Sequence, residues 1–166
     1  MPRLRLSITL IPALCLLAQA ADVPKPGASA PDFSLPALRQ GEKPVSLNSL
    51  AGKVVLVDFW ASWCPPCAKS LPHLARLRGV HPGLTILAVT IDENRQKALD
   101  FLDKQDHSLV YLHDAKHTVA EAYGLGGMPS LIIVDRKGVL RYRHDGYSES
   151  DMQEIEAEIA AVMGEK

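Results

Sequence analysis

The sequence predicts an α/β fold of three layers, in which helices cover both faces of a mixed central sheet. Two near-continuous apolar runs, residues 53–61 and 84–91, are typical of strands that are buried on both faces. Helical periodicity follows each run, and this alternation favours parallel strands. A hairpin pattern over residues 131–143 adds an antiparallel edge, and an amphipathic helix follows it.

Length and composition are those of one globular domain. The chain has 166 residues, of which 47% are hydrophobic and 22% are charged, so it can bury one sizeable core. A formal net charge of -1 provides no basic surface for nucleic acid, and we expect no such partner. Three cysteines are too few for a scaffold that depends on disulfides.

Residues 1–20 have the pattern of a secretory signal peptide. Two early arginines precede an apolar run over residues 6–18, and small residues fit cleavage after Ala20. The alternative is an uncleaved leader that anchors the domain to the membrane. Cys15 lies inside the apolar run and would leave with the leader. We therefore expect a periplasmic protein, in a compartment where a cysteine pair is redox-active or structural.

Residues 21–44 are predicted to form a proline-rich lead-in with a short strand, before a domain over residues 45–166. Phe33 and Leu35 supply the alternating apolar positions of that strand. Proline keeps the backbone extended and lowers its entropy. The lead-in contains five of the chain's twelve prolines: Pro24, Pro26, Pro31, Pro36 and Pro44.

Three helices are expected between the first buried strand and the hairpin. The first covers about residues 64–78, where leucines recur at helical spacing. The second covers residues 94–104. The third, over residues 116–123, is closed by Gly124. A short strand over residues 109–112 separates the second helix from the third.

The C-terminal part is expected to hold the hairpin and the last helix. Residues 131–134 and 139–143 form the two strands, joined by the turn sequence Asp-Arg-Lys-Gly. Ser148 is a candidate N-cap, because an acidic residue stands three positions later. One apolar face of the last helix is shared by Met152, Ile155, Ile159 and Val162.

Two cysteines stand where the first buried strand gives way to a helix. Only two residues separate Cys64 from Cys67, so on a first helical turn the two can approach to disulfide distance. Cys64 would be the N-cap, where the helix dipole and unpaired amides favour the nucleophilic thiolate. Cys67, one turn further in, would be the buried partner that resolves a mixed disulfide.

A cysteine pair of this spacing also occurs in zinc sites and as a structural staple. A zinc site needs two more ligands, and the sequence offers no second cysteine pair and only His73 in the downstream helix. We expect His113 and His117, four residues apart, to be surface residues. A disulfide that closes four residues restricts the unfolded chain little. Redox chemistry is therefore favoured over both alternatives.

Two prolines between the cysteines bear on the direction of that chemistry. Pro65 suits the first helical position, where its missing N–H costs nothing. Pro66 also lacks an N–H, so the next amide that can donate to the Cys64 sulfur belongs to Cys67. Fewer donors stabilise the thiolate less, which makes the pair a weaker oxidant and a better reductant.

Several segments resemble the thioredoxin superfamily: VVLVDFWASWCPPC, the helix proline Pro72, and GGMPSLIIVDRKG. The closest subgroup is the exported TlpA/ResA-like thiol-disulfide oxidoreductases. This subgroup and the related redoxins are also similar in the segments PDFSLPAL and VSLNSLAGK. The resemblance extends from about Ala30 to the C-terminus and implies a thioredoxin-like three-layer sandwich.

The resemblance implies further site residues. Met128–Pro129 matches the family's cis-proline element, which lies against the disulfide and binds substrate backbone; from the residues alone, an ordinary trans proline stays open. Asp58 matches an aspartate that helps to deprotonate the buried cysteine. It interrupts an apolar strand, where desolvation would raise its pKa, and a satisfied or partly exposed strand residue is the alternative. Trp63 and Pro65 complete the expected substrate-binding surface.

Some positions depart from the patterns of related families. Many relatives carry Thr where Met128 stands, so this chain offers substrates a softer, apolar surface. Ser70 occupies a position that is often Glu in ResA-like proteins, which weakens the inference of a role in cytochrome c maturation. Ala61 stands where peroxiredoxin-like peroxidases typically carry Thr.

The predicted function is an exported thiol-disulfide oxidoreductase that reduces protein disulfides. A soluble reductant in an oxidising space needs re-reduction, and the resemblance implies a membrane thiol-electron donor. The alternatives are a peroxiredoxin-like peroxidase and a copper-binding thiol chaperone. The redox centre would be the Cys64–Cys67 pair itself, without a metal or other cofactor, in a monomer.

Overall fold

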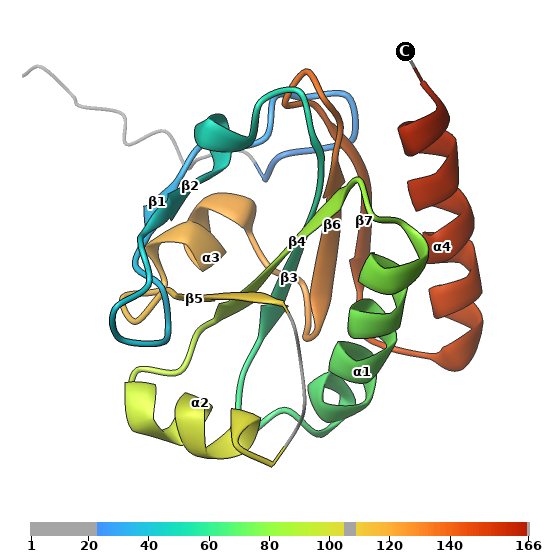
Figure 1. Ribbon diagram of the computed structural model, residues 1–166. Helices are drawn as coiled ribbons and strands as arrows, with labels where there is room; N and C mark the ends of the chain where they lie inside the picture. The colour runs from blue at the N-terminus through green and yellow to red at the C-terminus, as the bar shows by residue number, and fades with distance from the viewer. Residues whose placement is uncertain (1–22, 105–108, 166) are drawn as a thin grey trace, which may run out of the picture.

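A computed structural model describes residues 23–104 and 109–165, so the predicted leader lies outside the described residues. Five strands form the main sheet, in the order β5-β4-β3-β6-β7 (Figure 1). No helix in the described part of the chain is long and apolar enough to cross a membrane.

The main sheet is mixed, as the sequence predicts. Strands β3 (Val54–Trp60), β4 (Leu84–Thr90) and β5 (Val110–His113) run parallel. Strand β6 (Ser130–Val134) pairs antiparallel with β3, and β7 (Leu140–Asp145) pairs antiparallel with β6. The hairpin therefore extends the sheet on the side of β3 away from β4.

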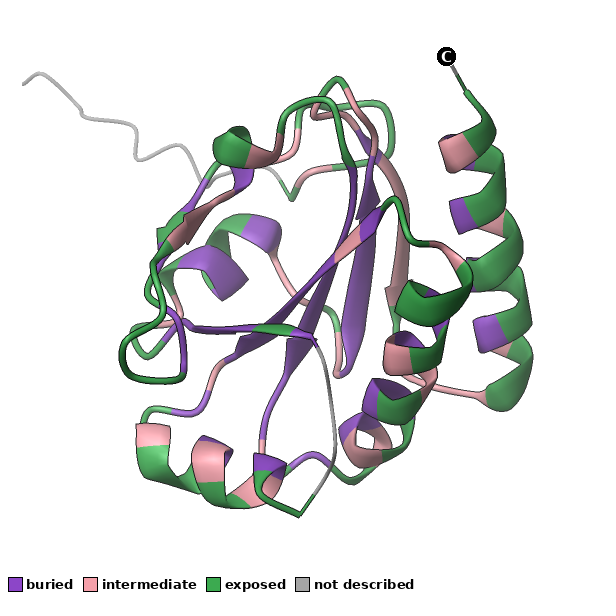
Figure 2. Ribbon diagram, viewed as in Figure 1, coloured by how far each residue is buried: buried purple, intermediate pink, exposed green. Residues whose placement is uncertain are grey.

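Strand β3 lies at the centre of the sheet because it carries apolar residues on both of its faces. All seven of its residues are buried, and it lies between β4 and β6. Apart from Asp58, every residue of this strand is apolar, and apolar side chains on both sides of a strand need cover on both faces of the sheet. Figure 2 shows the strands of the main sheet largely in the colour of buried residues, whereas the helices around them carry exposed outer faces.

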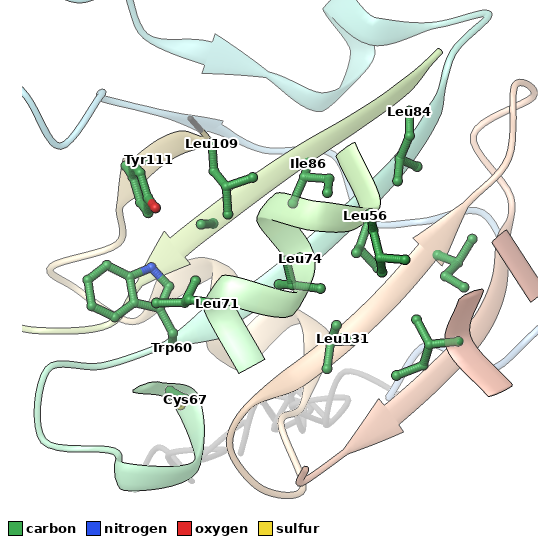
Figure 3. Close-up of a cluster of buried hydrophobic side chains, with 14 of the residues drawn as sticks. Leu56, Trp60, Cys67, Leu71, Leu74, Leu84, Ile86, Leu109, Tyr111 and Leu131 are labelled. Carbon is green, nitrogen blue, oxygen red and sulfur yellow. The ribbon is translucent and has the colours of Figure 1, made fainter. Parts of the chain in front are cut away.

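One face of the sheet is covered by three helices. These are α1 (Pro65–Val80), α2 (Arg95–Leu102) and α4 (Glu149–Gly164), which share a hydrophobic cluster with the sheet. Figure 3 shows part of this cluster, with Trp60 and Cys67 at the end near the start of α1. Four residues of α4 are buried there, as predicted: Met152, Ile155, Ile159 and Val162.

The opposite face is covered by smaller elements. Helix α3 (Thr118–Tyr123), the 3-10 helix η1 (Leu47–Leu50) and the short strands β1 (Ser34–Leu35) and β2 (Val45–Ser46) lie over it. The predicted strand near Phe33 thus exists as β1, paired antiparallel with β2. Strand β2 and η1 have no counterpart among the sequence predictions. Their short spans leave too little periodicity to detect.

The segment before β2 packs along both edges of the main sheet. The Gly27 amide donates to the carbonyl of Leu140, the first residue of β7, at 2.8 Å. Further along, the Leu38 amide donates to the Tyr111 carbonyl of β5, also at 2.8 Å. Tyr123 adds a third tie by donating from its hydroxyl to the Pro31 carbonyl.

Local capping signals place the helix ends close to where the sequence predicts them. The Ser148 hydroxyl accepts from the Asp151 amide at 3.2 Å and begins α4. The Asn94 side chain caps α2 in the same way through the Gln96 amide. Gly124 ends α3 with a φ of 56°, a left-handed conformation that glycine adopts at low cost.

Candidate active site

Cys64 and Cys67 lie where β3 gives way to α1, and they form a disulfide with a Cα–Cα distance of 5.3 Å. A tight turn carries the chain from the strand into the helix, with the Cys64 amide donating to the Ala61 carbonyl at 3.1 Å. Cys64 is the N-cap of α1, as the spacing predicts. Its sulfur therefore lies at the positive end of the helix dipole.

The Cys64 sulfur receives one hydrogen bond from the helix backbone. The donor is the Cys67 amide, with an N–S distance of 3.3 Å. An N-cap side chain is normally served by the second and third helical amides. Here the second helical residue is Pro66, which has no N–H to donate. The prediction that only the Cys67 amide reaches this sulfur is confirmed for the start of α1.

The surroundings of the pair are asymmetric. Cys67 is wholly buried and Cys64 is 5% exposed, which agrees with the predicted order of burial. Trp63 is 62% exposed and forms an apolar platform beside the disulfide, whereas Trp60 is buried in the core. Ser70 is also buried, and its hydroxyl donates to the Cys67 carbonyl at 3.1 Å. Cys64, which directly follows the exposed Trp63, is therefore the more accessible of the two cysteines.

Asp58 lies on the face of β3 that carries the disulfide end of the core. Side chains alternate along a strand, and Leu56 and Trp60 on either side belong to the cluster that contains both cysteines. In the sheet, Asp58 is opposite Ala88 of β4 and Leu131 of β6, both members of that cluster. Its carboxyl group consequently faces the helical layer that includes α1.

The Asp58 carboxyl group is fully buried, and neither oxygen has a hydrogen-bond partner among the described residues. Burial raises its pKa to about 8, because the charged form loses its hydration. The alternative of a satisfied or partly exposed strand residue is therefore wrong for Asp58. A carboxyl group with this pKa can exchange a proton near neutral pH.

Met128–Pro129 forms a cis peptide bond. The trans alternative left open by the residues alone is therefore wrong. Ser130, the next residue, pairs with Phe59 in the sheet, so the cis-proline loop lies at the end of β6 that adjoins the start of the Cys64 turn. Met128 packs against the cluster that contains both cysteines.

Asp92 forms a hydrogen-bond network that the sequence did not reveal. Its carboxylate accepts from the Ser62 amide at 2.8 Å, the Ser62 hydroxyl at 2.7 Å and the Thr90 hydroxyl at 2.7 Å. Ser62 precedes Trp63 and Cys64, so Asp92 holds the turn that presents the disulfide. An acidic residue just past a buried strand was the only available signal, and it did not identify the partner.

The two histidines expected at the surface are held by backbone carbonyls. His113 is 8% exposed and its Nε2 lies 2.7 Å from the Asp92 carbonyl oxygen. The prediction that His113 lies at the surface is therefore wrong. His117 is half-buried and its Nε2 lies 2.8 Å from the Ile91 carbonyl oxygen. Within residues 23–104 and 109–165, no group of three or more His, Cys, Asp or Glu is placed to hold a metal ion.

Comparison with known proteins agrees with this geometry. Residues 25–160 match the Redoxin family. A thiol:disulfide interchange protein DsbE from Allochromatium vinosum is 32% identical over 140 residues, which cover 82% of this chain and 77% of the relative. A thiol-disulfide oxidoreductase ResA from Halalkalibacterium halodurans is 32% identical over 130 residues, covering 77% and 73%.

The fold has relatives among solved structures. A Chlorobium tepidum protein described as a thiol:disulfide interchange protein DsbE superposes with a TM-score of 0.81 at 33% identity. The match covers 85% of this chain and 99% of that one. The predicted thioredoxin-like sandwich is thereby confirmed over most of the described chain.

Proposed function

This chain belongs to the redoxin family and is a thiol-disulfide oxidoreductase, and from that premise we propose that it reduces protein disulfides through Cys64 and Cys67. The direction of catalysis, reduction rather than oxidation of substrates, is inferred from the single backbone amide that donates to the Cys64 sulfur. A thiolate with few donors is poorly stabilised, so the dithiol gives up its electrons more readily.

The cycle starts from the reduced pair. The Cys64 thiolate attacks one sulfur of a substrate disulfide, forms a mixed disulfide and releases the other substrate sulfur as a thiolate. The Cys67 thiolate then attacks the Cys64 sulfur, closing the intramolecular disulfide and releasing the second substrate sulfur. Two electrons pass from the cysteine pair to the substrate, and no further cofactor is required.

Asp58 would supply the base for the second half of this cycle. Cys67 is wholly buried, so bulk water cannot readily remove its proton. Asp58 faces the same helical layer, and its pKa of about 8 matches the proton-transfer task near neutral pH. In this proposal the Asp58 carboxylate accepts the Cys67 proton as the thiolate attacks, and the proton later passes to the departing substrate sulfur.

Substrate would bind across the exposed rim of the disulfide. Trp63 would offer the platform, with Pro65 at the start of the helix beside it, and Met128 and Pro129 would form a second wall. The apolar character of this rim suits an unfolded or extended polypeptide segment rather than a highly charged one. A Cys67→Ala variant should accumulate mixed disulfides at Cys64, and mass spectrometry of these adducts would identify the substrates.

The direction of catalysis is tested by the reduction potential of Cys64–Cys67 in glutathione buffers. We expect a value near that of thioredoxin, about -270 mV, rather than near strong oxidants at about -120 mV. Pro66→Ala would restore an amide at the second helical position and should raise the potential by about 30 mV.

Pro65→Ala is the matched control for that measurement. It adds an amide at the first helical position, which does not serve an N-cap side chain, so the potential should shift by less than about 10 mV. A wild-type potential close to -120 mV would reject the reductase proposal. Tight stoichiometric copper binding without disulfide reduction would instead support a chaperone.

The proposed place of action is the periplasm, with electrons supplied by a membrane thiol donor. Support comes from the leader pattern in residues 1–20 and from the need to re-reduce the pair in an oxidising space. Intact-mass measurement of the protein from a periplasmic extract tests the first point. A mass that corresponds to a chain beginning at Ala21 is expected, whereas full-length protein in the membrane fraction would indicate an anchor.

A further inference from the structure

A second carboxylate, Asp145 at the end of β7, touches the cis-proline loop from outside the disulfide site. Its Oδ1 accepts from the Ser130 hydroxyl at 2.5 Å. The backbone of Gly126 also hydrogen-bonds to this carboxylate. Gly126 and Ser130 bracket Met128–Pro129, so one side chain contacts both ends of the loop.

The Asp145 carboxylate lies so close to the loop backbone that it leaves no room for a side chain at position 126. A Cβ atom at position 126 would lie 2.8 Å from the Asp145 Oδ2 atom, closer than real contacts allow. Neither Gly126 nor Gly127 has a positive φ, so close approach is the reason for glycine at position 126. The Gly146 amide adds a further tie by donating to the Pro129 carbonyl at 2.7 Å.

Arg143 anchors Asp145 to the rest of the fold. Its Nε atom donates to Asp145 Oδ2 at 3.0 Å. Its terminal nitrogens donate to the Tyr123 carbonyl at 2.6 Å and the Gly124 carbonyl at 2.7 Å, at the end of α3. The guanidinium group is thus held at three points, and it fixes the carboxylate relative to both the sheet and α3.

The sheet register connects this network to the disulfide. Ser130 is opposite Phe59 on one side and Asp145 on the other, so the three lie in one row across β3, β6 and β7. Met128 and Pro129 immediately precede this row, and Met128 packs against the cluster that contains both cysteines. Any displacement of the loop relative to β3 would change the distance between the substrate-binding wall and the Cys64 sulfur.

We propose that Asp145 is a positioning residue that holds the Met128–Pro129 wall at the distance from Cys64 required to bind an extended polypeptide substrate. This inference rests on the proposed function. Asp145 does not touch the cysteines, so it acts on the polypeptide bound by the loop and leaves the intrinsic redox chemistry of the pair unchanged. Small disulfides, which do not need the loop, should react independently of Asp145.

The test compares Asp145→Ala with Asp135→Ala at the other end of the same hairpin. Asp135 is a close chemical match, because it also accepts from backbone amides, those of Lys137 and Val139, and from an arginine, Arg141. It lies in the turn between β6 and β7, at the opposite end of β6 from the loop. Both full-length variants are reduced with dithiothreitol, desalted and mixed with insulin or with a small aromatic disulfide.

Asp145→Ala should lower kcat/KM for insulin reduction by about 10-fold, mainly through KM, because the bound segment is misplaced. The rate with the small disulfide and the reduction potential of Cys64–Cys67 should stay within about 2-fold and 10 mV of wild type. Asp135→Ala should match wild type in all three measurements apart from any loss of thermal stability.

A second pair of variants examines the same network from β6. Ser130→Thr keeps the hydroxyl that donates to Asp145, and Ser130→Val replaces it with a methyl group at nearly equal volume. Ser130 is fully buried, so any added volume must fit into the core. Because threonine and valine have nearly the same volume, the two substitutions differ mainly in the hydroxyl group. Only Ser130→Val should reproduce the insulin-specific loss.

Two outcomes would overturn the inference: equal losses in Asp145→Ala and Asp135→Ala, or an equal loss with insulin and the small disulfide. A wild-type protein that fails to reduce insulin at all, but reacts with the small disulfide, would instead reject the proposed function. The two failures are therefore distinguishable.

Discussion

Asp58 and Asp92 are both buried carboxyl groups near the disulfide end of the sheet, but their surroundings are opposite. Asp92 is 2% exposed and accepts hydrogen bonds from the amide and hydroxyl of Ser62 and from the Thr90 hydroxyl. Asp58 is fully buried and has no hydrogen-bond partner among the described residues. A partnered carboxylate holds a loop in place, whereas an unpartnered one is suited to exchange a proton.

The largest expected difference between Asp58 and Asp92 is in how the free energy of unfolding depends on pH, and this dependence comes from Asp58. Its pKa is about 8 in the folded protein and near 4 when unfolded, so between these pH values only the folded state keeps the proton. Stability should therefore fall as pH rises from about 4 to 8, by up to about 1.4 kcal/mol per pH unit.

Urea denaturation of the oxidised protein at several pH values, compared with Asp58→Asn, isolates this effect. The variant has no titrating group at this position and should become the more stable protein as pH approaches 8. A constant difference in unfolding free energy across this range would show that Asp58 does not retain a proton in the folded state.

Asp92→Ala should destabilise the protein by about 3 kcal/mol. The substitution leaves the amide and hydroxyl of Ser62 and the hydroxyl of Thr90 without their acceptor in a largely buried site. The midpoint of urea denaturation measures the loss. Glu93→Ala, at the exposed neighbouring residue, serves as the control and should change stability by less than about 0.5 kcal/mol.

Asp58→Asn should slow the release of substrate from the mixed disulfide by about 100-fold near pH 7, through loss of the base for Cys67. Single-turnover kinetics would follow this step. The wild-type rate should rise with pH with an apparent pKa near 8, because the carboxylate is the active form, and the variant should lack this rise. An Asp58→Asn rate equal to wild type would eliminate Asp58 as the base.

Ser62→Ala should have the smallest effect, a loss of about 1 kcal/mol, because the Ser62 amide still donates to Asp92. Combining Ser62→Ala with Asp92→Ala should cost less than the sum of the two single changes, since both remove the same hydrogen bond. Strict additivity in urea denaturation would mean that the hydroxyl and the carboxylate are not energetically coupled.

Much of the fold could be predicted because its signals are local. The apolar run of β3, the caps at Ser148 and Gly124, and the buried face of α4 each depend on residues only a few positions apart. The short strand β2 was missed because two residues carry no periodicity. The surface prediction for His113 was wrong because its ring is held by the Asp92 carbonyl, which is 21 residues away in sequence.

The sequence by itself determined the reactive pair: the spacing of Cys64 and Cys67, the N-cap position, and the two prolines that withhold amides all lie within one helical turn. Tertiary structure alone decided which carboxyl groups are satisfied. Besides a partner two residues away, Asp92 binds Ser62, 30 residues distant, and Asp145 binds Ser130, 15 residues distant. The fold of the sheet brings these distant partners together. Hydrogen bonds act over about 3 Å in space, so sequence neighbours cannot reveal them when the sheet sets the contacts.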